Sequence, residues 1–295
     1  MGPLDQVKLH SLMNISTGIS EIVIGIIDGP VDFKHPALQG SRIRTINDSQ
    51  LAACKNANSI ACIHGTFVTG ILSAKRGVSA PSICPDCEII LRPIFNENAS
   101  HNNNDNTLTT LPASTPEKLS SAIIETIDAG ARIINLSAGL VSPSLVSYHK
   151  LQEAYDYALQ KDVMIVVAAG NQGNIGNISL VEHEWVIPVV ACNENGRFDP
   201  MSNFGPSIGR RGLMAPGVNI SSTSPGGEYT HMSGTSFAAP FVTGVIALLW
   251  SIFPKTTTTQ MIYSIGKGAS FNRRSIIPPL LNAEMALEVL KNIKS

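Results

Sequence analysis

The amino-acid sequence predicts an α/β fold: a doubly wound, mostly parallel sheet with helices on both of its faces, in a single domain. Short runs rich in β-branched residues recur along the chain and alternate with segments whose apolar residues are spaced three and four apart. The chain has 295 residues, of which 43% are hydrophobic and 15% charged. It is therefore long and apolar enough to bury a large core, and its composition is not that of a disordered or coiled-coil protein.

Five runs have the composition of buried parallel strands. They are apolar almost throughout rather than alternating between apolar and polar residues, which is typical of strands covered on both faces. Turn residues bound each of them, and they occupy residues 22–27, 88–94, 131–136, 163–168 and 186–191. We expect these runs to form the sheet.

Helical patterns lie between and after the predicted strands. One covers residues 119–127 and ends at Gly130, and another covers residues 151–159. The longest apolar stretch, at residues 237–253, is short for a membrane span of about 20 residues. We therefore interpret it as a helix buried in the core.

The same patterns predict the domain organisation. A single domain covers residues 1–295, with its core at about residues 20–253 and a helical extension at residues 254–295. Residues 96–117 interrupt the alternation with asparagine, threonine and proline, and we expect them to form a mobile loop. This loop is either a solvated insertion or a flap that contacts substrate, since it leaves the edge of the sheet where ligands bind.

Positive and negative charges are balanced. Lysine and arginine number 21 and aspartate and glutamate 22, for a formal net charge of −1, so no broad field attracts nucleic acid or an acidic membrane. The N-terminal residues lack the basic and apolar segments of a secretory signal. We expect a cytoplasmic protein that binds neither nucleic acid nor a membrane, and the sequence leaves its oligomeric state open.

The five cysteines do not form a recognisable framework. Cys84 and Cys87 make a CxxC pair. A zinc site of four cysteines would need a second such pair, whereas Cys54 and Cys62 are eight positions apart. These four residues and Cys192 are therefore interpreted as ordinary thiols or as one or two local disulfides. Since the chain has no oxygen-rich acidic cluster either, we expect no bound metal and no cofactor.

Polar residues follow three of the predicted strands. Asp28 and Ser137 come directly after the first and third runs, and Asn171 comes within three residues of the fourth. The carboxyl ends of parallel strands meet at one edge of a sheet, where such folds bind their ligands. We therefore expect these three side chains to project from one edge.

The chain contains one candidate for each group that nucleophilic cleavage of an acyl bond requires. This chemistry needs a hydroxyl, an imidazole that takes its proton, a carboxylate that orients the imidazole, and donors for the developing oxyanion. Ser236 lies just before an apolar helix, whose N-terminus favours negative charge, and His64 lies at the start of a helical run of small residues. Asp28 ends an apolar strand and precedes Gly29, so we expect its carboxylate to be desolvated and held by hydrogen bonds.

In these segments the chain resembles the subtilases, the subtilisin-like serine proteases. The resemblance rests on the HGT motif at His64, on the segment SGTSFAAP at residues 233–240, and on the chain order Asp28, His64, Ser236. It implies a serine endopeptidase in which Asp28 orients His64, His64 is general base and then general acid, and Ser236 is the nucleophile. It also implies that the Asn171 amide joins the Ser236 N–H in an oxyanion hole.

The resemblance further implies where a peptide or protein substrate binds. Two backbone segments line the first specificity pocket and pair with the extended substrate, and they consist of Ser137, Ala138, Gly139, Ala168, Ala169 and Gly170. Taken alone, Ser137 is also readable as a strand-end cap and Asn171 as a turn residue after a strand.

Finer details resemble the proteases that trim precursor peptides of cyanobactin-type ribosomal natural products. These details lie at residues 28–32, 92–95, 135–139 and 233–238. That subgroup contains leader-cleaving proteases and macrocyclases, and the macrocyclases carry extra helices between the catalytic aspartate and histidine. The 36 positions from Asp28 to His64 are too few for such helices, which favours hydrolysis over ring closure.

Three alternatives stay open. The chain is a transpeptidase or macrocyclase on the same class of precursor, a general intracellular subtilisin-like protease, or an inactive protease fold that only grips a peptide. A nucleotide-binding sheet is excluded, because no glycine-rich phosphate-binding motif follows a predicted strand. Residues 70–81 are fewer than the calcium loop of secreted subtilisins needs, which agrees with an enzyme independent of metal.

Overall fold

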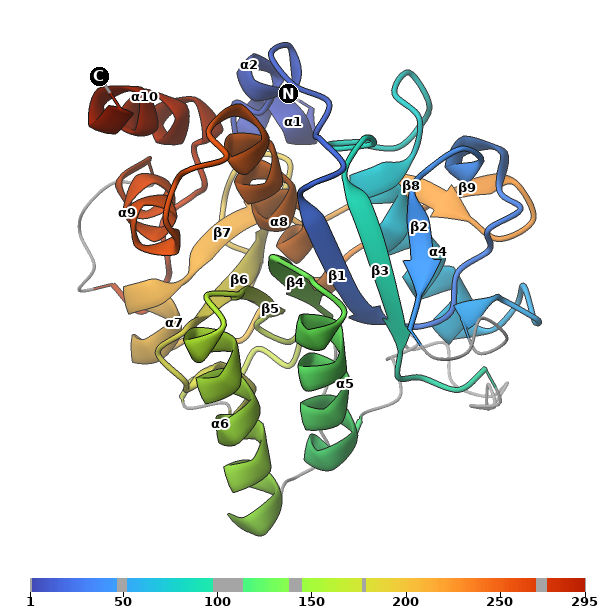
Figure 1. The fold of residues 1–295 in the computed structure, drawn as a ribbon, viewed down its shortest axis with the longest axis horizontal. Coiled ribbons are helices and arrows are strands. Elements are labelled where there is room, and N and C mark those ends of the chain that lie inside the picture. The colour runs from blue at the N-terminus through green and yellow to red at the C-terminus, as the bar shows by residue number, and fades with distance from the viewer. Residues whose placement is uncertain are drawn as a thin grey trace.

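The computed structural model describes residues 2–46, 52–97, 114–137, 145–176, 179–268 and 275–294. Figure 1 shows a central sheet with helices packed on both faces. The sheet has seven parallel strands in the spatial order β2 (Ile43–Thr45), β3 (Glu88–Pro93), β1 (Val23–Asp28), β4 (Ile133–Leu136), β5 (Met164–Ala168), β6 (Val186–Cys192) and β7 (Leu213–Pro216). The fold class predicted from the sequence is therefore confirmed.

All five predicted strands are present, and their ends differ from the prediction by at most two residues. They are neighbours in the sheet, from β3 through β1, β4 and β5 to β6. β2 and β7, which form the two edges, are strands that the sequence pattern did not predict. β2 has only three residues, with Arg44 exposed at its centre, and β7 ends at Pro216, which has no N–H for a ladder.

A second sheet was also missed. It is the antiparallel hairpin of β8 (Ile220–Ser224) and β9 (Glu228–Met232). The three serines and one threonine of β8 have the composition of a polar loop, but two of them, Ser222 and Thr223, lie buried against α4 (Ile60–Ser73). The Ser222 and Thr223 hydroxyls each donate a 2.8 Å hydrogen bond to a main-chain carbonyl of that helix. Their polarity is therefore satisfied inside the protein.

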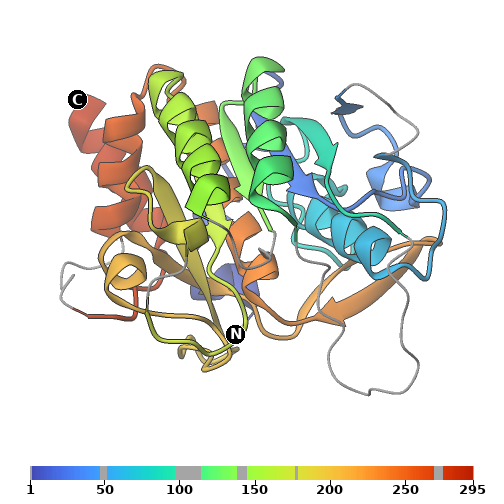
Figure 2. The ribbon, with the colours of Figure 1, turned by 90° about the horizontal axis from the view of Figure 1, so that it is seen from below.

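The main sheet separates two hydrophobic cores, because successive strand residues point to opposite faces. In β5, for example, Val166 belongs to one core and Val167 to the other. α4 and α8 (Thr235–Ile252) pack in the first core, and α5 (Pro116–Asp128) and α6 (Leu145–Gln160) in the second. Figure 2 shows α5 and α6 side by side on their face of the sheet.

α8 is the helix predicted from the apolar stretch at residues 237–253. By length and composition it could cross a membrane, with a mean hydropathy of 1.7, but 89% of it is buried inside the molecule. Its largest side chains, Phe241 and Trp250, are fully buried. The interpretation as a core helix is confirmed.

Most of the predicted mobile loop at residues 96–117 lies outside the described residues, at positions 98–113. Its C-terminal limit is wrong, because α5 begins at Pro116. Thr115 caps this helix by accepting a 3.3 Å hydrogen bond from the Lys118 N–H, and a proline suits the first helical position.

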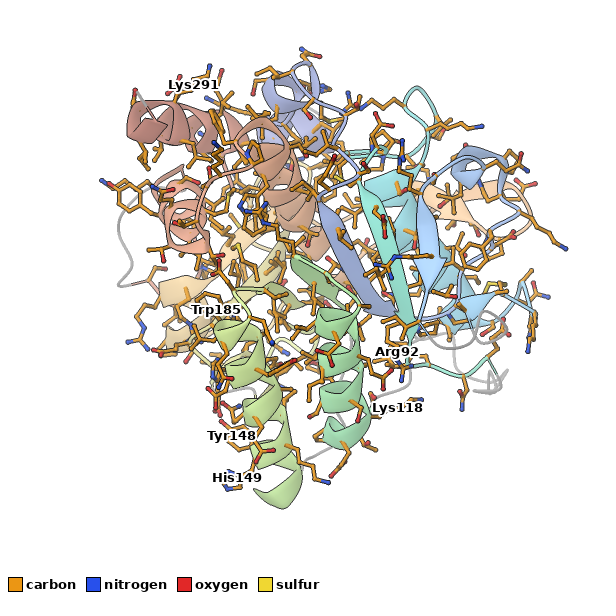
Figure 3. All side chains as sticks on the ribbon, in the orientation of Figure 1. Arg92, Lys118, Tyr148, His149, Trp185 and Lys291 are labelled. Carbon is orange, nitrogen blue, oxygen red and sulfur yellow. A yellow bond between two sulfur atoms is a disulfide. The ribbon has the colours of Figure 1, made fainter. Side chains whose placement is uncertain are left out.

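Polar side chains tie α5 and α6 to their neighbours (Figure 3). Arg92 of β3 donates to both carboxylate oxygens of Glu125 on α5, at 2.7 and 3.3 Å. On α6, the Tyr148 hydroxyl donates a 2.7 Å hydrogen bond to Glu182. These contacts lie on the outer face of the molecule, away from the α8 core.

The remaining helices are short or lie near the ends of the chain. α9 and α10 pack against each other within residues 254–295, where the sequence predicts a helical extension. The Ala283 N–H at the start of α10 donates a 2.9 Å hydrogen bond to the Val7 carbonyl, which joins the two ends of the chain. These helices are α1 (Pro3–Gln6), α2 (His10–Met13), η1 (Pro36–Leu38), η2 (Ser179–Val181), α7 (Pro206–Arg211), α9 (Thr258–Gly268) and α10 (Ala283–Lys294).

Candidate active site

The structure brings the predicted carboxylate and imidazole together. Asp28 is the last residue of β1, and its side chain is fully buried. Its Oδ1 accepts hydrogen bonds from His64 Nδ1 at 2.7 Å and from the Gly29 N–H at 2.6 Å. Because a carboxylate only accepts hydrogen bonds, Nδ1 carries a proton, and in the neutral ring Nε2 is the free acceptor.

His64 lies inside α4 rather than at its start, because the helix begins four residues earlier, at Ile60. The residue is 4% exposed, and its ring packs against Phe237, with 5.0 Å between the ring centroids. α4 lies directly on the turn that follows β1. This close approach requires Gly65, since a Cβ there would lie 2.4 Å from the Gly29 carbonyl oxygen.

Ser236 is the second residue of α8, which begins at Thr235 rather than after the serine as predicted. Its N–H is therefore one of the first-turn donors that a helix does not pair internally. Its carbonyl oxygen accepts a 3.3 Å hydrogen bond from the Ser137 hydroxyl. Among the residues that the structure describes, the Ser236 hydroxyl makes no hydrogen bond to the His64 ring; such bonds between nucleophile and base often tighten only when substrate binds.

Asn171 follows β5 and is bound to the first turn of α8. Its Oδ1 accepts a 2.8 Å hydrogen bond from the Thr235 N–H, which leaves the Nδ2 donors for a ligand beside Ser236. The neighbouring Gly170 N–H donates to the Thr235 hydroxyl at 3.0 Å. Two hydrogen bonds, one at Gly170 and one at Asn171, therefore join the loop after β5 to the start of α8.

Asn203 holds this loop, although no sequence motif marks it as a site residue. The residue is 3% exposed, and its N–H donates a 2.8 Å hydrogen bond to the Gly170 carbonyl. Its side chain donates to the Ala169 carbonyl at 3.0 Å and accepts from the N–H groups of Gln172 and Asn174 at 3.2 and 2.9 Å. Gly170 has φ +96°, and a Cβ there would lie 2.3 Å from Asn203 Nδ2, so this tight contact requires glycine.

The predicted substrate-binding residues are only partly described. The Ser137 hydroxyl is buried between the Ser236 carbonyl and the Asn135 side-chain amide, which donates to it at 3.2 Å. Asn135 in turn accepts a 3.0 Å hydrogen bond from Thr243 of α8. The Ser137 side chain therefore anchors α8 to β4, and its N–H donates to the Ile27 carbonyl at 3.4 Å, so only the Ser137 carbonyl is left for the predicted pairing with substrate.

The other pocket residues lie next to these anchors. Ala168 and Ala169 are buried at the end of β5, and Gly170 is more accessible. Ala138 and Gly139 lie outside the described residues, so their predicted role stays a prediction.

One disulfide lies beside the candidate site. It joins Cys54 to Cys62, and Cys62 is two positions before His64 on α4. Cys84, Cys87 and Cys192 are free and buried. Of the alternatives that the sequence left open, the structure therefore contains one local disulfide and three thiols.

The sequence model of the subtilase family matches residues 20–274. The chain belongs to the subtilase family. This subtilase is 33% identical over 244 residues to the thermophilic serine proteinase of Bacillus sp. (strain AK1), a match that covers 81% of this chain and 54% of the relative. It is 31% identical over 270 residues to fervidolysin of Fervidobacterium pennivorans, covering 82% of this chain and 36% of the relative. The chain thus spans about half the length of the first relative and less of the second.

Solved structures similar to this subtilase include maturation proteases. A mutant of the protease domain of PatA superimposes with a TM-score of 0.81 and 29% identity, covering 93% of this chain and 97% of that one. The prenylagaramide maturation protease PagA gives a TM-score of 0.80 and 27% identity, covering 96% and 98%. The PatG macrocyclase domain is 21% identical, with a TM-score of 0.80, and shows only that the fold is shared.

Proposed function

We propose that this subtilase is a serine endopeptidase that cleaves peptide bonds through an acyl-enzyme on Ser236. The observation that carries the proposal is the 2.7 Å contact between His64 Nδ1 and the buried Asp28 carboxylate, two residues 36 positions apart. The ring of this histidine also packs on the residue that follows Ser236. This contact pairs the carboxylate and the imidazole that nucleophilic catalysis needs, beside the serine that we propose as the nucleophile.

Each group has one role in the reaction. Asp28 fixes the tautomer of His64, so Nε2 takes the proton as Ser236 Oγ attacks the substrate carbonyl carbon. His64 then gives this proton to the leaving amine, which breaks the peptide bond and leaves an ester on Ser236. A water molecule repeats the sequence and releases the acid. The buried carboxylate also stabilises the imidazolium that forms at each step.

Asn171 and the first turn of α8 supply the oxyanion hole. The Asn171 Nδ2 donors and the Ser236 N–H face the carbonyl oxygen that becomes negative during the attack. The hydrogen bond from Thr235 to Asn171 Oδ1 holds the amide in place beforehand, so little reorganisation is needed in the transition state. The positive end of the α8 dipole adds to this stabilisation.

We propose that the substrate is a ribosomally made precursor peptide, from which this subtilase removes the leader. Support comes from PatA and PagA, two maturation proteases that match this chain over more than nine tenths of its length at 29% and 27% identity. The short spacing of Asp28 and His64 supports hydrolysis over ring closure. A linear, unstructured peptide is the expected substrate.

A fluorophosphonate probe, which reacts with an activated serine, tests the nucleophile. We expect the wild-type protein to be labelled at Ser236, and the Ser236→Ala and His64→Ala variants to lose labelling. Ser233→Ala is the matched control, because this exposed hydroxyl lies three positions earlier and only accepts a hydrogen bond from the Asn219 N–H. Equal labelling of wild type and Ser236→Ala would overturn the proposal.

Mass spectrometry of a linear peptide library in H₂¹⁸O tests the reaction and the substrate class. Hydrolysis places ¹⁸O in the new carboxyl terminus of a linear product, and the residues around the cut report the preference of the pocket. A cyclic product without added water would instead indicate a macrocyclase. Unchanged peptides, together with an unlabelled serine, would indicate a fold that only binds peptides.

A further inference from the structure

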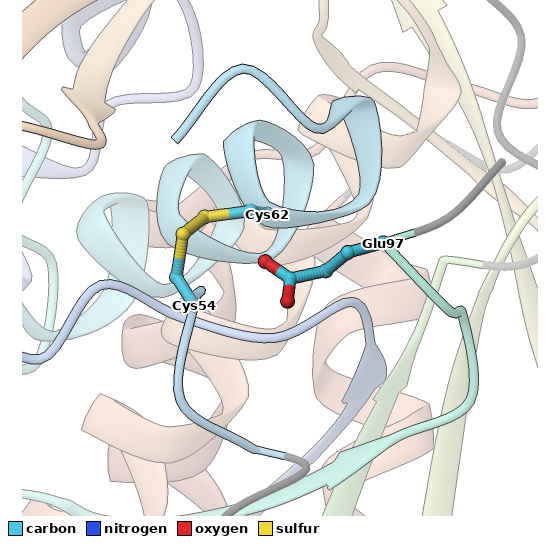
Figure 4. Close-up of side chains that lie close together, drawn as sticks. All are labelled: Cys54, Cys62 and Glu97. Carbon is cyan, nitrogen blue, oxygen red and sulfur yellow. A yellow bond between two sulfur atoms is a disulfide. The ribbon is translucent and has the colours of Figure 1, made fainter. Parts of the chain in front are cut away.

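Three ligand-bearing side chains lie together beside the N-terminus of α4, outside the proposed catalytic residues. Figure 4 shows the disulfide of Cys54 and Cys62 with the Glu97 carboxylate next to it. The two sulfur atoms and a carboxylate oxygen all lie within 4.8 Å of one another. The Cα atoms of the two cysteines are 5.5 Å apart, so both side chains converge on one point.

We propose that these residues form a redox-gated metal site: when the disulfide is reduced, Cys54, Cys62 and Glu97 bind a thiophilic divalent cation such as Zn²⁺. Two thiolates and one carboxylate are ligands that Zn²⁺ takes in proteins, and three of them leave one position for water. In the oxidised state the sulfur atoms are bonded to each other, and the site is closed to the cation.

Glu97 is already oriented for this role. Its Oε1 accepts hydrogen bonds from the N–H groups of Lys55 and Asn56, at 2.8 and 2.9 Å. Within the described ranges of the chain, no hydrogen bond reaches its Oε2. Oε2 can therefore bind a cation while Oε1 keeps the loop that carries Cys54 in place, as a supporting hydrogen bond does in metal sites.

Cys62 is placed to be a stable thiolate. It is the third residue of the 14-residue helix α4, where the unpaired N–H groups and the helix dipole favour negative charge. The Ser59 side chain makes no capping hydrogen bond that would compete for these donors. The Thr66 hydroxyl lies 4.0 Å from Cys62 Sγ, and its oxygen accepts a hydrogen bond from the Asp32 N–H, which leaves its hydrogen for the sulfur.

Opening the site is an ordinary thiol–disulfide exchange. Cys54 is partly exposed and Cys62 fully buried, so the thiolate of a dithiol reductant attacks Cys54 Sγ and Cys62 leaves as the thiolate. The second thiol of the reductant then attacks the mixed disulfide. The protein gains two electrons and two protons, and the reductant becomes a cyclic disulfide. The cation displaces the two thiol protons when it binds.

The other thiols of the chain provide an internal control. Burial raises the pKa of Cys192 to about 12, so this residue is a protonated thiol at neutral pH. Cys84 and Cys87 are buried beside each other, and the hydrogen bond with Cys87 raises the pKa of Cys84. All three thiols are present whether the Cys54–Cys62 disulfide is oxidised or reduced. Metal binding that appears only after reduction therefore cannot be attributed to them.

The test is a Cd²⁺ titration followed by the ultraviolet thiolate-to-metal charge-transfer band. The full chain carries Ser236→Ala to prevent self-digestion, so the result does not depend on the proposed peptidase activity. One sample is reduced with a phosphine and desalted without oxygen, and the other is kept oxidised. We expect one equivalent of Cd²⁺ to bind with a charge-transfer band in the reduced sample and none in the oxidised one. No band after reduction would overturn the proposal.

Two variants identify the ligands. Glu97→Gln is the matched change, because the amide oxygen still accepts both backbone hydrogen bonds while the NH₂ group cannot bind a cation. We expect it to weaken Cd²⁺ binding at least about tenfold. The double variant Cys54→Ser/Cys62→Ser keeps the three other thiols and should lose the band. Unchanged affinity in Glu97→Gln, or the same band in the double variant, would contradict the assignment.

Discussion

The helices on the two faces of the main sheet differ in how they are buried. On one face, every residue of α4 except Ile63 is buried, and α8 is buried from Phe237 to Trp250. On the other face, α5 buries one side and exposes the other, with Ser121 and Asp128 in solvent. Only the fully buried helices carry candidate catalytic residues, His64 on α4 and Ser236 on α8.

This difference has a physical reason. A helix that is buried on all sides begins in the interior, where its first-turn N–H groups and its dipole act on a charge with little screening by water. α5 and α6 are amphipathic, and they stabilise the sheet by covering it. His64, the polar ring on the buried helix α4, has its partner Asp28 inside the protein.

The largest expected effect contrasts two buried ring residues, one on each face. His64→Ala on α4 removes the proposed general base and should lower kcat/KM by more than about 10⁴-fold. Tyr155→Phe on α6 removes a buried hydroxyl that donates to the Leu180 carbonyl, and should leave kcat/KM within about twofold while costing roughly 1 kcal/mol of stability. Assays on a peptide identified from the library measure both, with circular dichroism as the folding control. A similar loss of activity in both variants would show that catalysis does not depend on the α4 and α8 face alone.

The next effect concerns the loop that Asn203 holds against the N-terminus of α8. Asn203→Ala leaves the Gln172 and Asn174 N–H groups without their acceptor and lets Asn171 move. We expect kcat to fall about 10- to 100-fold, because a misplaced oxyanion donor stabilises the transition state less. Asn195→Ala, an exposed asparagine on the same β6–β7 connection, is the control and should keep full activity. Fluorophosphonate labelling rates provide a second readout; equal rates in all three proteins would argue against a positioning role.

Substitution to alanine should change the stability of the protein in opposite directions on the two faces of the main sheet. Alanine is normally about 1 kcal/mol more favourable than glycine inside a helix. At Gly244 of α8, however, a Cβ would lie 2.6 Å from Ile83 Cγ2, so Gly244→Ala should destabilise the protein by about 1–3 kcal/mol. At the exposed Ser121 of α5, Ser121→Ala should stabilise it by about 0.5 kcal/mol. Urea unfolding on a Ser236→Ala background gives both values, and stabilisation by Gly244→Ala would show that α8 is less tightly packed than described.

The smallest expected effect is a pH dependence of stability that comes from Tyr148, on the outer side of α6. Burial and the hydrogen bond to Glu182 raise the pKa of Tyr148 to about 12. An unfolded tyrosine ionises near pH ~10, so between that pH and about 12 the unfolded chain has lost a proton that the folded protein keeps. Stability therefore falls as the pH rises through this window. Urea unfolding of Tyr148→Phe from pH 9 to 11 should give a shallower decline than wild type, with Tyr229→Phe on the hairpin as the matched control.

Much of the fold was predictable because its signals are local. The central strands are continuous apolar runs, and helix and strand periods differ clearly along one stretch of chain. The edge strands β2 and β7 were missed because neither is such an apolar run: β2 has three residues with the exposed Arg44 at its centre, and β7 ends at Pro216. β8 was missed because its serine and threonine side chains bond to the carbonyls of α4, more than 150 positions away.

The candidate site likewise contains residues that local motifs predicted and residues that only the structure revealed. Asp28, His64 and Ser236 stand in short motifs beside strand and helix ends, so their positions were read from the sequence. Asn203 has no such motif, since its partners Gly170 and Asn174 lie about 30 positions earlier. The grouping of Cys54 and Cys62 with Glu97 likewise depends on how the end of β3 meets the start of α4.

By itself, the sequence determined the class of fold, the central strands and helices, and which residues are candidates for acyl transfer, because each of these depends on residue type and short spacing. Only the tertiary structure decided which side chains meet. It joined His64 to Asp28, anchored Asn171 on α8, placed Asn203 beneath the loop and paired Cys54 with Cys62. The reason is that hydrogen bonds and metal ligands act over a few ångströms in space, and residues distant in the chain come that close only when the cores on both faces of the sheet have packed.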